Sequence, residues 1–93
     1  MNKIAIAAEL LAERAKNATD ATAFLVKTGT DRITLVPDME RRSDMDTNTF
    51  YHMETVVDIC RALHLSSYIT CGTTETRFGI RAVFEVNIYG FER

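Results

Sequence analysis

The chain has 93 residues, of which 46% are hydrophobic and 26% are charged, and its formal net charge is −2. These totals indicate one folded domain, and the weak negative charge excludes a general attraction to nucleic acid or to anionic lipid. No apolar run approaches the roughly 18 residues that a membrane span needs. Glu9 and Glu13 also interrupt the N-terminal segment where a signal peptide would stay apolar. We therefore expect a cytoplasmic protein in which Cys60 and Cys71 are free thiols.

Residues 3–16 are predicted to form an amphipathic helix. Apolar side chains recur there at the i, i+3/i+4, i+7 spacing that makes one buried stripe. The stripe consists of Ile4, Ala7, Ala8, Leu11 and Ala15. Ile6 and Leu10 are expected to widen it, and the many alanines would let the helix approach a sheet closely.

Residues 22–28 and 33–37 are predicted to form a β-hairpin. Both segments are rich in β-branched and aromatic residues, and residues 29–32 have the composition of a turn. One register places four apolar side chains on a common face: Phe24, Val26, Ile33 and Leu35. Pro37 has no N–H to donate, so it should end the second strand or place it at an edge.

Residues 38–48 form the most polar segment of the chain and its longest expected connection. We favour a solvated loop, since runs of charge are usually exposed. The alternative is a recognition loop, because Met39 and Met45 show no periodicity that would bury them and methionine adapts well to binding surfaces. The longer stretch 38–58 carries six acidic and two basic residues, a local charge of −4.

A second helix is expected from about residue 47 to residue 65, with Asp46 or Thr47 as its N-cap and serines after its end. Its apolar stripe consists of Met53, Val56, Val57, Cys60 and Leu63. The opposite side carries Glu54, Asp58 and Arg61. The helix should therefore bury one side and expose a charged one.

Residues 68–71 are predicted to form a short third strand, followed by a threonine-rich turn or bulged extension over residues 72–79. Residues 80–91 form the clearest element of the sequence, a strand whose side chains alternate strictly. Its apolar face consists of Ile80, Ala82, Phe84, Val86 and Ile88. Its mixed face consists of Arg81, Val83, Glu85, Asn87 and Tyr89.

The expected element order is α-β-β-α-β-β. The simplest packing is an α+β domain with a four-stranded antiparallel sheet and both helices on one face, because each helix has one apolar stripe. The other face of the sheet would then be exposed. We predict that this face serves as a homodimer or ligand surface, against the alternative of a merely solvated face. Its candidate residues are Arg81, Val83, Glu85 and Tyr89.

No motif in the sequence identifies a reaction, a metal or a cofactor. Cys60 and His64 stand one helical turn apart and could bind zinc together with Cys71, with His52 as a more distant ligand. Zinc sites usually show two close pairs of ligands, so we expect no metal here. Cys60 is instead expected to be a small core residue, and His64 to complement the negative end of the helix dipole. No nucleophile or phosphate-loop motif is present, and we predict a protein without enzymatic activity.

We predict that the protein works by stoichiometric binding of another protein. The acidic stretch would make the contact, through Asp38, Met39, Glu40, Asp44, Met45, Asp46, Glu54 and Asp58. A partner with a basic nucleic-acid-binding groove would fit this charge, which would make the protein an inhibitor of a nucleic-acid-binding machine. Anti-CRISPR proteins of phages and mobile elements are comparable in size and charge alone. An adaptor or subunit of a bacterial complex, binding through a sheet edge or face, is an alternative.

Binding of single-stranded nucleic acid on the open sheet face is a further alternative. Four-stranded sheets can stack unpaired bases on aromatic side chains beside basic ones. The candidate residues are Tyr68, Phe78, Tyr89, Arg77 and Arg81. The sequence lacks a basic stripe and places Glu85 in the middle of that face, so direct nucleic-acid binding is the less favoured prediction.

Overall fold

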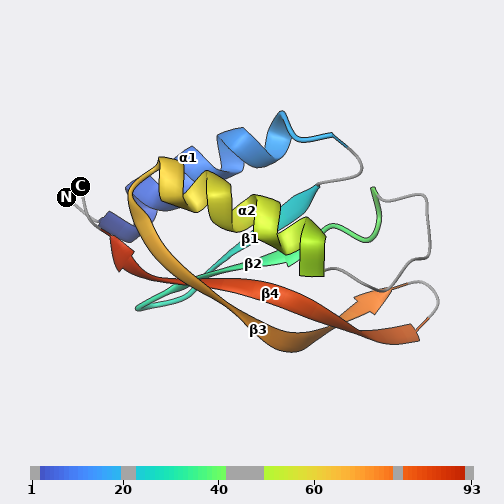
Figure 1. Ribbon diagram of the computed structural model, residues 1–93. Helices are drawn as coiled ribbons and strands as arrows, with labels where there is room; N and C mark the ends of the chain where they lie inside the picture. The colour runs from blue at the N-terminus through green and yellow to red at the C-terminus, as the bar shows by residue number, and fades with distance from the viewer. Residues whose placement is uncertain (1–2, 20–22, 42–49, 77–78, 92–93) are drawn as a thin grey trace.

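The computed structural model describes residues 3–19, 23–41, 50–76 and 79–91. Its elements are α1 (Lys3–Lys16), β1 (Phe24–Thr28), β2 (Ile33–Pro37), α2 (Phe50–Ala62), β3 (Leu65–Thr76) and β4 (Gly79–Phe91). The four strands form one antiparallel sheet in the order β1-β2-β4-β3. Both helices lie on the same side of this sheet (Figure 1). The predicted α+β fold and its element order are confirmed.

Helix α1 has the predicted bounds but a narrower buried stripe. Ala7 and Leu11 are buried, whereas Ile6 and Leu10 are 42% and 47% exposed. The prediction that these two residues widen the stripe is wrong, because only the side of the helix that carries Ala7 and Leu11 faces the sheet. The helix ends at Lys16, and the backbone N–H and side-chain amide of the next residue, Asn17, both donate to the carbonyl of Glu13.

The β1–β2 hairpin has the predicted register, with Val26 opposite Leu35. The N–H of Gly29 donates to the carbonyl of Arg32 at 2.8 Å and closes the turn. Pro37 is the last residue of β2 and lies beyond the residues that pair with β4, so its missing N–H costs no bond to that strand.

The second half of the chain departs from the prediction in two places. Helix α2 ends at Ala62 and not at residue 65, because His64 adopts a left-handed backbone with φ 62° and Leu65 already pairs with β4. Its predicted start and caps, Asp46 and Thr47, lie outside the described residues. β3 continues to Thr76, so of the two alternatives predicted for residues 72–79 the extension of the strand is correct and the turn is not. Its register with β4 shifts between Ser66 and Ser67, near the beginning of the strand.

The helices cover only part of the β3–β4 hairpin, which extends past them (Figure 1). A helix of 13 residues such as α2 is about 20 Å long, whereas the 13 residues of β4 span about 43 Å. Val86 and Ile88 are therefore fully buried in the core, but Ile80 on the same face is 72% exposed. The predicted apolar face of this strand is covered at one end only.

Candidate functional site

Strand register determines which side chains share the face of the sheet that the helices leave uncovered. Thr34 lies opposite Asn87, and Asn87 lies opposite Tyr68, so one row crosses β2, β4 and β3. Partners directly opposite each other in a sheet point to the same side. The strand residues on this open face are Leu25, Lys27, Thr34, Val36, Tyr68, Thr70, Gly72, Arg81, Val83, Glu85, Asn87 and Tyr89.

Two tyrosines lie side by side at one end of the open face. The ring centroids of Tyr68 and Tyr89 are 5.5 Å apart, with the ring planes tilted by 52°. Both side chains are exposed, Tyr68 at 43% and Tyr89 at 63%. A tilted pair at this separation is a favourable aromatic arrangement. The structure thus presents two amphipathic rings to solvent as one unit.

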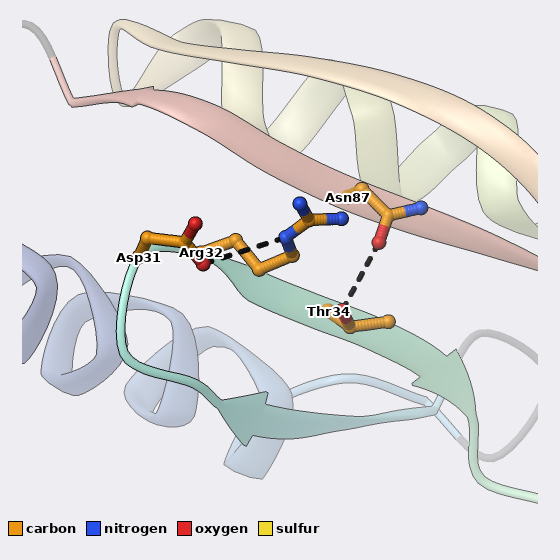
Figure 2. A network of polar contacts seen from close by, with 4 residues as sticks. All are labelled: Asp31, Arg32, Thr34 and Asn87. Carbon is orange, nitrogen blue, oxygen red and sulfur yellow. Dashed lines mark hydrogen bonds and ion pairs between the residues drawn. The ribbon is translucent and has the colours of Figure 1, made fainter.

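A hydrogen-bonded row of polar side chains fixes the surface next to these rings. The hydroxyl of Thr34 donates to Asn87 Oδ1 at 3.0 Å (Figure 2), and Asn87 Nδ2 donates to the hydroxyl of Thr70 at 2.7 Å. Asn87 is only 8% exposed, and both the oxygen and the nitrogen of its buried side-chain amide have hydrogen-bond partners. The row joins three strands and makes this part of the face rigid.

The open face carries more positive than negative side chains, in contrast to the chain as a whole. Arg32 extends over this face toward Asn87, with its Nε 3.6 Å from Asp31 Oδ1 (Figure 2). That ion pair is largely exposed and therefore weak. Lys27 and Arg81 lie on the same face, where Glu85 is the acidic strand residue.

Two valines farther along the open face are buried. Val83 is 3% exposed and Val36 is 1% exposed, although both belong to this side by register. The carboxylate of Glu85 lies across Gly72, in the space that a Cβ there would occupy. The prediction that Val83 is an exposed contact of the dimer or ligand face is therefore wrong, and of its two apolar members only Tyr89 is exposed.

Asp38, the first predicted contact of the acidic stretch, is an internal structural residue. It is 8% exposed, and its Oδ1 accepts the N–H groups of Glu40 at 3.1 Å and Arg41 at 3.3 Å. Its own N–H donates to the carbonyl of Ala23. An aspartate that bonds the backbone two and three residues ahead stabilises a turn. Asp38 is thus unavailable to a partner, which corrects the prediction.

The same turn is attached to the end of helix α1. The guanidinium of Arg41 donates to the carbonyl of Ala15 at 3.2 Å and to that of Ala18 at 2.7 Å. Carbonyls at the end of a helix lack intrahelical partners, and a cation there also complements the helix dipole. Residues 38–41 are therefore a docked turn and not a solvated loop.

Of the remaining candidates of the acidic stretch, the structure describes Met39, Glu40, Glu54 and Asp58. Asp44, Met45 and Asp46 lie outside the described residues. Met39 is half-buried, and Glu40 is exposed. Glu54 and Asp58 are exposed on α2, where Asp58 forms an ion pair with Arg61 at 3.0 Å that is itself largely exposed. Glu40, Glu54 and Asp58 remain as exposed acidic side chains of the predicted contact.

The two cysteines are free and lie in different environments. Cys60 is buried in the core, where desolvation raises the pKa of its thiol to about 11 despite a hydrogen bond with Ser67 that lowers it. Cys71 is exposed on β3. Within the described part of the chain, no three His, Cys, Asp or Glu residues are grouped as metal ligands would be. The side chain of His52 lies outside that part.

No family model matches this sequence, and neither the curated proteins nor the solved structures include a significant match. None of the described helices has the length and apolar character that crossing a bilayer requires.

Sequence reasoning identified both tyrosines but missed the polar row beside them. Asn87 was placed on the correct face, yet its partners Thr34 and Thr70 are 53 and 17 residues away in sequence. Finding them required the strand order, which single-strand patterns do not contain. Arg32 was missed because it stands in a turn, outside any alternating pattern.

Proposed function

We propose that this protein is a non-enzymatic binding protein that associates stoichiometrically with another protein. The contact is the part of its open face where the two tyrosines are exposed. We call this surface the tyrosine site and define it by Arg32, Tyr68, Asn87 and Tyr89. The observation that carries the proposal is the exposed pair of tyrosine rings, 5.5 Å apart on a hydrogen-bonded face. The predicted contact thus moves from the acidic stretch to the sheet.

The residue types at the tyrosine site are those that contribute most to protein interfaces. Tyrosine and arginine are enriched among residues whose truncation costs the most binding energy, because they add large contact areas and directed hydrogen bonds. A surface held rigid before binding also loses less entropy on association. Leu25, 45% exposed on the same face, adds apolar contact area that suits a protein more than a nucleic acid.

The charge of the open face favours a neutral or acidic contact surface on the partner. Lys27 and Arg32 would be repelled by the basic groove that the sequence predicted for the partner. An inhibitor that blocks such a groove would instead use the exposed Glu40, Glu54 and Asp58, which makes the acidic contact the alternative within this proposal. We also propose a cytoplasmic location, because both cysteines are free thiols.

Affinity capture with matched variants tests the proposal and separates the two contacts. The tagged protein is captured from native lysate after nuclease treatment, and the recovered proteins are identified by mass spectrometry. We expect a protein that is retained by the wild type and lost with the double variant Tyr68→Ala and Tyr89→Ala. Leu10→Ala, which shortens an exposed apolar side chain on α1, is the control and should retain it.

Charge reversal at Glu54→Lys with Asp58→Lys is the second arm. If this variant loses the partner and the tyrosine variant keeps it, the acidic contact is correct and the tyrosine site is not. Circular dichroism of each variant confirms that the fold is intact. Failure of the wild type to retain any protein above the untagged control contradicts protein binding as the function.

Single-stranded nucleic acid is the second candidate, favoured by the cations Lys27, Arg32 and Arg81 on the same face as the tyrosines. Stacking of a base on an aromatic ring and contact of a cation with phosphate would both be available. Fluorescence anisotropy with labelled single-stranded DNA and RNA of about 15 nucleotides measures this directly. Salt-dependent binding that Arg32→Ala weakens would support it, and equal anisotropy with and without protein would reject it.

A further inference from the structure

We propose that two copies of this chain associate through their β3 strands, paired antiparallel about a two-fold axis near Cys71. This arrangement places α2 of each copy beside the uncovered half of the other copy's β3–β4 hairpin. It concerns the edge of the sheet and its helix side, whereas the tyrosine rings lie on the opposite face, although Tyr68 also belongs to β3.

The first observation is an apolar surface that the chain's own helices leave uncovered. Ile80 is 72% exposed, and Ala82 on the same side of β4 is also exposed. Phe84 is half-buried at the border of the core, and Cys71 opposite it on β3 is exposed. These side chains continue the face that holds Val86 in the core. β4 thus carries core-type residues past the end of the core, beside the exposed Thr73 and Glu75 of β3.

The second observation is the free edge of β3. This strand is the last on its side of the sheet, it has 12 residues, and its sequence contains one charged residue, Glu75, and no proline. Proteins usually protect an edge strand with lysines, prolines or shortness. The other edge shows this protection, because β1 has five residues and includes Lys27. Among the residues that the structure describes, β3 is the edge left open to pairing.

A second copy is the occupant that fits both features at once. The same strand pairs with itself when two copies are related by a two-fold axis, and such an interface is closed and self-complementary. With the axis at Cys71, Glu75 lies opposite Ser67 of the partner subunit, so no two carboxylates meet across the strands. Pairing of β3 along its length would use about 40 Å of edge.

The position of α2 explains how this pairing covers the exposed apolar surface. α2 packs over the beginning of β3, where Cys60 contacts Ser67 and where Leu65 joins the core. Antiparallel pairing sets the beginning of one β3 beside the end of the other. Helix α2 of one copy then lies next to Cys71 and Thr73 of the other copy, beyond the point where that other copy's own helices end. Each copy supplies the cover that the other lacks.

Sedimentation velocity at several protein concentrations tests the association. We expect the wild type to form a dimer as the concentration rises and Cys71→Lys to remain monomeric, because that substitution sets two ammonium groups against each other at the axis. Thr28→Lys, at an exposed position of the other edge strand, should dimerise like the wild type. A monomeric wild type at all concentrations, or a dimer unaffected by Cys71→Lys, overturns the proposal.

A cross-linking experiment on the wild type keeps the test independent of how the lysine variant folds. Residues directly opposite in antiparallel strands have Cα atoms about 4.5–5.5 Å apart, which lies within the range of a disulfide. Mild oxidation should therefore link the chains through Cys71, detected by peptide mapping, and leave the buried Cys60 reduced. A dimer in solution that gives no Cys71 cross-link overturns the proposed pairing.

Discussion

The two halves of the β3–β4 hairpin share one alternating pattern but differ in what covers them. Near the C-terminus of β4, Val86 and Ile88 are fully buried beneath the helices. Near its start, Ile80 stands on the same face and is 72% exposed. Alternation therefore shows which residues share a face, but the lengths of the covering elements decide which of them are buried.

On the opposite side of the hairpin, the open face, the exposed and the buried halves are exchanged. The half beneath the helices exposes Tyr68 and Tyr89 on its open face, whereas Val83 in the projecting half is buried. Each half thus offers one exposed surface, and the two surfaces lie on opposite sides of the sheet. The proposed dimer therefore covers the side of the hairpin opposite the exposed tyrosine rings.

The largest expected difference between the halves is in stability. Ile88→Ala should reduce the free energy of unfolding by about 2–5 kcal/mol, because it leaves a cavity in a fully buried region. Ile80→Ala should change it by less than about 0.5 kcal/mol in the monomer, since that side chain is already in water. Urea unfolding at a concentration where the protein sediments as a monomer measures both. Equal losses would contradict the difference in cover.

A second contrast lies in the polar row of the covered half. Asn87→Ala should cost about 1–3 kcal/mol, because the buried amide makes two hydrogen bonds, to the part-buried hydroxyls of Thr34 and Thr70, and both are lost. Thr73→Ala, at an exposed position of the projecting half, is the control and should cost less than about 0.5 kcal/mol. Chemical denaturation compares the two variants. If Asn87→Ala lowers the free energy of unfolding no more than Thr73→Ala, the row does not fix the surface.

Cys60 of α2 is buried in the core, so the free energy of unfolding should depend on pH. Burial raises the pKa of Cys60 from 9.0 to about 11, so between these values the unfolded chain loses its thiol proton while the folded protein retains it. The stabilisation is therefore complete below about pH 9 and is lost as the pH rises toward 11. The stability advantage of the wild type over Cys60→Ala should shrink across this range in denaturation curves. A difference that does not change with pH would contradict this origin.

The smallest effect is expected at the junction where α2 passes into β3. His64 has φ 62°, a left-handed conformation that glycine adopts without steric cost. His64→Gly should therefore raise the free energy of unfolding by about 0.5–1 kcal/mol, seen as a higher melting temperature. His64→Ala keeps the Cβ and serves as the control, which should show no such gain. Destabilisation by glycine would indicate that the imidazole itself holds the junction.

Local patterns predicted those elements whose signals are local. The bounds of α1, the strand β2 and the β1–β2 register follow from apolar spacing and a glycine turn. Residues 72–79 were left open between a turn and an extension of the strand, because Gly72 and the threonines after it have turn composition; pairing with β4 overrides that preference. Propensity is a weak guide where a long partner strand is present.

The candidate site was predictable in part, for a related reason. Strict alternation placed Tyr89 and Asn87 on the open face. The burial of Asp38, the attachment of Arg41 to α1 and the row from Thr34 to Thr70 depend on contacts between distant segments. A run of acidic residues gave no sign that its first member stabilises a turn. Charge patterns identify where polar residues gather, and tertiary contacts decide which of them are free to bind.

The central claim is that the projecting half of the hairpin, with the free edge of β3, is a surface for a second copy. Amide hydrogen exchange at a low and a high protein concentration, read by mass spectrometry, tests it most directly. We predict that residues 71–76 exchange more slowly at the high concentration, while residues 24–28 of the other edge strand exchange equally at both. Equal exchange of residues 71–76 at the two concentrations, or added protection at β1, would contradict the claim.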